Sequence, residues 1–83
     1  MNRYVATFHT HLSAMLTCRA LTDSGLEARM APVPRSISSS CGTCVFYTAQ
    51  EICRELLDED TERVYEQQGE SYVMLLDLEN GDR

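Results

Sequence analysis

The chain has 83 residues, 43% of them hydrophobic, and a formal net charge of −6 at pH 7. This size and composition predict one globular domain over residues 1–83, near the lower limit at which a core stabilises a chain. No apolar run approaches the roughly 20 residues of a membrane span, and nothing at the N-terminus resembles a signal peptide. We therefore expect a cytoplasmic protein without membrane contact, whose four cysteines are not structural disulfides.

Charge is distributed unevenly. Residues 1–50 carry four arginines and two acids, a net of +2, whereas residues 51–83 carry three arginines and eleven acids, a net of −8. Lysine is absent, and no basic stripe exists to release phosphate counterions, so nucleic-acid binding is not expected. The acidic C-terminal part is predicted to be a solvated face or, alternatively, to steer a basic partner.

The first predicted elements are a strand at residues 3–8 and a helix that begins near the N-cap Thr10 and stops at Gly25. One helix face should meet the sheet, through Ala14, Met15, Cys18 and Leu21. A second apolar stripe is predicted to be a core edge or a homodimer contact, at Leu12, Leu16 and Ala20.

Strands are predicted next at residues 26–33 and 43–48, followed by a second helix at 49–60 and a fourth strand at 62–67. The second helix should turn apolar side chains inward, at Ile52, Cys53, Leu56 and Leu57. Residues 71–79 are a fifth strand or a short terminal helix, and their β-propensity favours the strand.

The order β-α-β-β-α-β predicts an α+β, ferredoxin-like sandwich: an antiparallel sheet with two helices on one face, plus the C-terminal strand or short helix. In that topology the first two strands run in the same direction, so the loops that leave them lie at one end of the sheet. The first loop contains His9, Thr10 and His11, and the second contains Arg35 and Cys41. We expect these two segments to converge on one site.

The second loop, within PVPRSISSSCGTC at residues 32–44, is predicted to present Cys41 as a nucleophile. A helix N-terminus or a nearby cation lowers the pKa of a thiol, and Arg35, His9 and His11 could contribute. Hydroxyl and backbone donors that suit an anion, or a negatively charged sulfur or selenium, are expected from Ser38, Ser39, Ser40 and Gly42.

Other interpretations of the cysteines and serines stay open. Cys44 is either a buried strand residue or a resolving thiol, and the serines are also good turn formers. Cys18 and Cys53 are predicted to be core residues. A zinc site is a further interpretation, with the ligands Cys41, Cys44, His9 and His11. A single C-x-x-C that leads into a strand argues against zinc and against a thioredoxin-like redox motif.

The chain combines a first strand ending in Phe8, its Thr/His turn, the helix with Ala14 and the segment GLEARMAPVPRSISSSCG. In these features it resembles a small bacterial domain, the selenium/sulfur carrier protein-like family. The resemblance covers roughly residues 3–66 and leaves the acidic extension 68–83 outside. The residues that match the family loop are Pro34, Arg35, Ser38, Cys41 and Gly42, and Cys44 departs from it.

This resemblance implies a compact α+β domain whose Cys41 carries sulfur or selenium as a persulfide or selenopersulfide. It predicts a carrier protein rather than a turnover enzyme, without a cofactor. The partners would be a donor such as a cysteine desulfurase and an acceptor protein. Cys44 could then resolve the persulfide as an internal disulfide. The alternative is a non-catalytic module that binds a small ligand or another protein, in which Cys41 would be unreactive.

Overall fold

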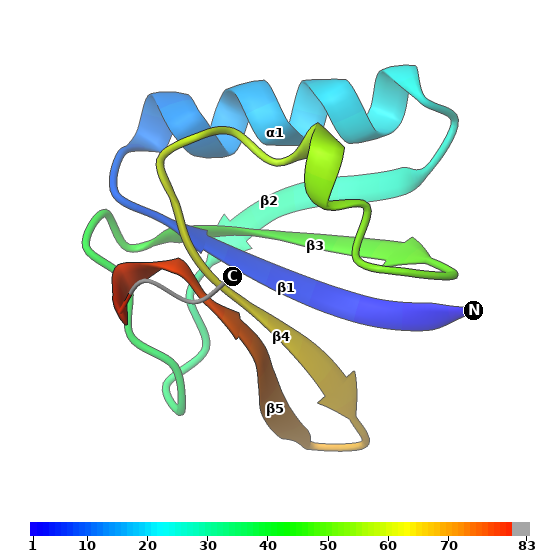
Figure 1. Cartoon of the computed structure of the whole chain (residues 1–83). Helices are drawn as coiled ribbons and strands as arrows, with labels where there is room; N and C mark the ends of the chain where they lie inside the picture. Colours follow the sequence, from blue (N-terminus) through cyan, green and yellow to red (C-terminus); the bar gives the residue numbers. More distant parts are fainter. Residues whose placement is uncertain (81–83) are drawn as a thin grey trace.

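The computed structural model describes residues 1–80 (Figure 1). Its elements in chain order are β1 (Asn2–Phe8), α1 (His11–Asp23), β2 (Glu27–Pro32), β3 (Thr43–Ala49), the 3₁₀ helix η1 (Arg54–Leu56), β4 (Thr61–Gln68), β5 (Ser71–Asp77) and the 3₁₀ helix η2 (Leu78–Asn80). The α+β class and the five predicted strands are confirmed. Within residues 1–80 no helix is long and apolar enough to cross a membrane.

The five strands form one sheet in the order β2-β3-β1-β4-β5, and every neighbouring pair is antiparallel. Because β3 lies between β1 and β2, these two strands run in the same direction. The loops after β1 and β2 therefore leave the sheet at the same end, as the sequence predicted (Figure 1). β5 is an edge strand on β4, which confirms the strand interpretation for residues 71–77, while residues 78 and 79 belong to η2.

α1 begins and ends where the sequence predicted. The Thr10 side chain accepts a hydrogen bond from the Ser13 backbone N–H at 3.1 Å, an N-cap that satisfies one of the free amides of the first turn. Just past the helix, Gly25 has φ +88°, in the left-handed region that favours glycine at a helix C-terminus.

The inner face of α1 differs in part from the prediction. Ala14 and Leu21 are buried and Cys18 is half-buried, but Met15 is exposed because Ser13 and Thr17 share the inner face instead. The predicted second stripe is mostly exposed to solvent, with Leu12 at 61% and Leu16 at 46% exposure. A homodimer contact through that stripe stays a prediction.

The second helix is absent from the described residues, so the ferredoxin-like arrangement with two helices is wrong. The eleven residues 50–60 contain only the three-residue η1, and Cys53 before it has φ 59°. β3 and β4 are both antiparallel to β1, so the chain must return along the length of the sheet between them. Eleven helical residues rise about 16 Å, less than the roughly 23 Å of a seven-residue strand. An extended path is therefore required.

The crossover nevertheless packs on the core beneath α1 (Figure 1). The predicted inward residues contact the core cluster from half-buried positions, and they are Ile52, Cys53, Leu56 and Leu57. Asp58 fastens this segment to the helix: its carboxylate accepts the Ser13 hydroxyl at 2.8 Å, and its N–H donates to the Thr17 hydroxyl at 2.9 Å. The buried hydroxyls of α1 thus find their partners on the crossover.

We predict that Asp58→Ala destabilises the fold by about 1–3 kcal/mol, because it leaves the buried Ser13 hydroxyl without its acceptor. The free energy of unfolding can be measured by urea denaturation followed by circular dichroism. The neighbouring exposed Glu59→Ala is the control and should change stability by less than about 0.5 kcal/mol. Equal losses in the two variants would contradict the role given to Asp58.

Candidate functional site

The connection between β1 and α1 meets the loop at residues 33–42 at one end of the sheet. The Ser39 hydroxyl donates to the Phe8 carbonyl at 3.1 Å, and His11 Nδ1 lies 3.3 Å from the Thr43 hydroxyl. Two segments about thirty residues apart in the chain are therefore in direct contact, as the topology predicted. The Thr10 hydroxyl, also predicted for this site, caps α1 instead.

Cys41 lies in this region as a half-buried free thiol. Its S–H donates to the Thr43 carbonyl at 3.4 Å, its Sγ is 4.0 Å from the Ser39 hydroxyl, and its side chain packs against the core on the α1 side. Gly42 follows with φ +75°, which permits the sharp turn back into β3. The Gly42 carbonyl accepts the Val33 N–H at 3.2 Å and closes the base of the loop.

A buried carboxylate that sequence reasoning missed holds the residue before Cys41. Glu62 is 2% exposed; its Oε1 accepts the Ser40 backbone N–H at 3.3 Å, and its Oε2 accepts the Ser40 hydroxyl. Between Thr7 and Phe8 of β1 the register with β4 shifts, and Glu62 is the extra residue on β4. A β-bulge redirects side chains in this way, and strand alternation alone gives no signal of it.

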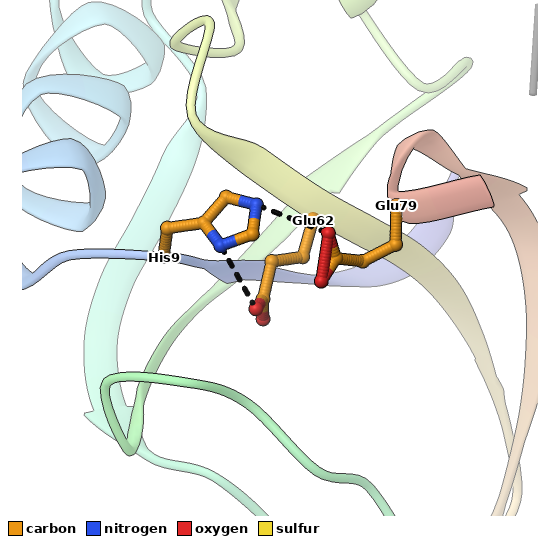
Figure 2. Close-up of side chains that lie close together, drawn as sticks. All are labelled: His9, Glu62 and Glu79. Carbon is orange, nitrogen blue, oxygen red and sulfur yellow. Dashed lines mark ion pairs between the residues drawn. The ribbon is translucent and has the colours of Figure 1, made fainter. Parts of the chain in front are cut away.

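His9 joins this carboxylate to a second one (Figure 2). Its Nδ1 lies 3.3 Å from Glu62 Oε2, and its Nε2 lies 3.3 Å from Oε1 of Glu79 on η2. Both ring nitrogens of His9 thus face a carboxylate oxygen, and these two contacts fasten the β1–α1 connection to β4 and η2.

The same cluster could hold a metal ion, since the ligand atoms of His9, Glu62 and Glu79 all lie within 4.8 Å of one another. Imidazole with carboxylates suits first-row divalent cations. This set differs from the one expected for zinc: across residues 1–80 it is the one such group, and it contains neither cysteine nor His11. The zinc interpretation built on Cys41, Cys44, His9 and His11 is therefore not supported.

Cys44 occupies a buried strand position, the first of the two alternatives that the sequence left open. It is 0% exposed, lies in a cluster with Val5, Ile37 and Tyr65, and donates its S–H to the Pro32 carbonyl at 3.7 Å. Burial raises the pKa of this thiol to about 11. A buried, protonated thiol is a poor resolving nucleophile.

The remaining loop residues are more exposed. Arg35 lies in a turn closed by the Ile37 N–H and the Pro34 carbonyl at 3.0 Å, and it forms no ion pair with any described residue. A shallow cavity of about 260 Å³ beside the loop is lined by Ser38, Ser39, Ser40, Glu62, Arg63 and Glu79. Arg63 pairs with Asp77 at 3.2 Å. The surroundings of the serines therefore combine hydroxyl groups with carboxylates, where the sequence predicted cations.

Comparison with known proteins identifies the family. The profile described as "Putative Se/S carrier protein-like" matches residues 3–66. The chain belongs to this family. Over 48 residues it is also 29% identical to the uncharacterized protein YtiA of Escherichia coli (strain K12), an alignment that covers 58% of this chain and 56% of that relative. The chain therefore matches just over half the length of that relative. No solved structure matches the chain.

We predict that Cys44 stays unmodified by iodoacetamide at pH 8 in the folded protein and reacts after unfolding in urea, because the native thiol is buried and protonated.

The raised native pKa of Cys44 also stabilises the fold fully below the unfolded value near 9, and this contribution is lost as pH rises toward about 11. Cys44→Val should therefore lose less unfolding free energy than the wild type between pH 8 and pH 10.5. An identical pH dependence in both proteins would contradict the assignment.

Glu62→Ala should release Ser40 and loosen the loop that presents Cys41, since both Ser40 donors lose their acceptor. The expected result is a severalfold faster alkylation of Cys41 at pH 7, measured by peptide mass spectrometry, with a stability loss of about 1–3 kcal/mol. The exposed Glu70→Ala is the matched control. An unchanged alkylation rate in Glu62→Ala would show that the carboxylate does not restrain the loop.

Proposed function

We propose that this protein carries sulfur or selenium on Cys41 as a persulfide or selenopersulfide and passes it to an acceptor. The observation that supports this most is the position of Cys41 in a chain of the Se/S carrier family. It is a half-buried free thiol at the meeting point of two loops, within a loop fastened to β1 through Ser39 and to β4 through Ser40.

Loading is a sulfur transfer without net oxidation. The Cys41 thiolate attacks the terminal sulfur of a donor persulfide, R–S–SH, and forms a new S–S bond. The bond between the two donor sulfurs breaks, and its electron pair leaves with the donor thiolate, R–S⁻. Selenium follows the same scheme from R–S–SeH. A cysteine desulfurase, which forms such a persulfide on its own cysteine, fits as the donor, and this covalent carriage requires no cofactor.

Discharge runs as the reverse type of reaction. An acceptor nucleophile attacks the terminal atom, and Cys41 leaves as a thiolate. The structure gives no reason to involve Cys44, which is buried with its sulfur hydrogen-bonded to the Pro32 carbonyl. The proposed carrier therefore delivers its chalcogen to another molecule rather than releasing it by an internal disulfide.

The proposed binding groups for the negatively charged terminal atom come from the same loop. The Ser38 hydroxyl and the backbone amides of Ser39, Cys41 and Gly42 would donate hydrogen bonds to it, as such groups do in anion-binding loops. The Ser39 hydroxyl and both Ser40 donors, which the sequence also suggested, are already bonded to Phe8 and Glu62. Arg35 is proposed to supply positive charge, since its exposed guanidinium pairs with no acid among residues 1–80. The carboxylate of the neighbouring Glu62 contacts Ser40 and His9 and is not proposed to contact the terminal atom.

The test is loading followed by intact-protein mass measurement. Reduced protein is incubated with a cysteine desulfurase and cysteine, and separately with a selenocysteine lyase and selenocysteine. We expect a mass increase of one sulfur or one selenium atom that maps to Cys41 and is removed by a thiol reductant. Cys41→Ser should abolish loading, and Arg35→Gln should lower the loaded fraction severalfold.

Cys53→Ser is the matched control, because Cys53 is also a half-buried free thiol but lies in the crossover between β3 and β4. It should load to the wild-type level. Wild-type loading of Cys41→Ser would refute the proposal. Failure of both donors, with Cys41 slow to alkylate at neutral pH, would favour the alternative of a non-catalytic binding module.

A further inference from the structure

The sheet face that points away from α1 is covered over only part of its area. Ile37, from the loop at residues 33–42, packs on Val5, Cys44 and Tyr65 and buries them. Toward the other end of the sheet, where β1 begins at Asn2, this cover stops. A hollow of about 480 Å³ remains there, within the range of pockets that hold small ligands.

Strand register brings polar side chains from all five strands into this hollow. Arg3 of β1 and Glu27 of β2 both pair with Thr48 of β3, and Gln67 of β4 pairs with Tyr72 of β5. Side chains in register on neighbouring strands share one face, and the Tyr4–Glu66 pair of β1 and β4 places Arg3 and Gln67 close together between the two groups. The five residues of these two groups all line the hollow.

Aromatic side chains and arginines also line the hollow. The Arg29 guanidinium lies 4.6 Å from the centroid of the Phe46 ring, a cation–π contact that presents a flat, charged surface. Phe46 and Tyr72 are half-buried, and both line the hollow. Arg3 and Arg29 are exposed and form no ion pair with any described residue, in contrast to Arg63, which is bound to Asp77.

The charge of the hollow is opposite to that of the protein. Its lining contains two arginines and one acid, Glu27, whereas the chain has a net charge of −6. Guanidinium groups bind phosphate through paired hydrogen bonds and stack on planar rings. A phosphate on a flexible polymer would meet repulsion from the acidic remainder of the molecule, while a single phosphate would not.

We infer that this hollow binds a small ligand with a heteroaromatic ring and a phosphate, of the nucleoside monophosphate class. The ring stacks against the Arg29–Phe46 pair and Tyr72, and the phosphate accepts hydrogen bonds from Arg3. The Thr48 hydroxyl and the Gln67 amide read polar atoms of the ring or sugar. The site is independent of the carrier proposal, since Arg3 opens β1 whereas the Cys41 loop contacts Phe8 at its other end.

The experiment is an NMR titration of the isotopically labelled full chain with AMP, GMP, CMP and UMP in low salt. We expect saturable shifts of the backbone amides of Arg3, Arg29, Phe46, Thr48 and Tyr72 with at least one nucleotide. Adenosine and inorganic phosphate, tested separately, should bind at least roughly tenfold more weakly than AMP if AMP is bound, because each lacks one recognised part. Raising the salt concentration should weaken binding.

Arg3→Gln and Arg29→Gln should each weaken the nucleotide roughly tenfold or more, with the remaining spectrum unchanged as evidence of folding. Arg19→Gln, an exposed arginine on α1, is the matched control and should bind as the wild type does. The inference is overturned if none of the four nucleotides gives saturable shifts, if phosphate alone binds as tightly as the nucleotide, or if the Arg19 variant loses the same affinity. Much tighter binding of an eight-residue single-stranded RNA would likewise overturn it in favour of a polymer.

Discussion

The burial of β1 on both faces is the constraint on which the rest of the structure depends. Val5, Ala6, Thr7 and Phe8 are consecutive and all 0% exposed, and β1 is paired on both edges, with β3 and β4. Consecutive side chains of a strand point to opposite faces, so the burial of all four requires a cover on each face of the sheet. α1 and the crossover cover one face, and the loop at residues 33–42 covers part of the other.

The second cover explains why the serine-rich loop has two different duties. Ile37 is 7% exposed and packs on Val5 and Cys44, so this loop does contribute to the core, which its composition did not suggest. Four residues later the chain turns back at the end of the sheet, and Cys41 packs on the opposite, α1 side. Ile37 and the Ser40–Glu62 contact fix the loop around the thiol, so its presentation is a consequence of core packing.

Local patterns in the sequence predicted those parts of the fold that depend on near neighbours. Period-two alternation located the strands, and the Thr10 cap and Gly25 located the ends of α1. The prediction of a second helix was wrong for a reason that is not local. Its apolar residues do reach the core, but the eleven residues between β3 and β4 are too few for a helix that also returns along the sheet. The path that the chain must take between β3 and β4 therefore decided the structure of this segment, and the helical spacing of its apolar residues did not.

The site was predictable to the same extent. Topology placed the segments of His9, His11 and Cys41 at one end of the sheet, because that inference requires only strand directions. Glu62 could not be found, since a one-residue bulge turns it inward, and Glu79 reaches His9 from η2, which follows β5 at the far edge of the sheet. Carboxylates thus stand where cations were expected, and they explain how an acidic chain holds its loops together at this end.

The same loop also shapes the opposite end of the second face. Phe46 and Tyr72 pack against the cluster that Ile37 completes, and both line the arginine-containing hollow. The position of Ile37 therefore affects two surfaces: the wall of the hollow through Phe46 and Tyr72, and the setting of Cys41 through the loop backbone. Core packing on this face thus sets both the wall of the hollow and, four residues beyond Ile37, the place where the chain presents Cys41.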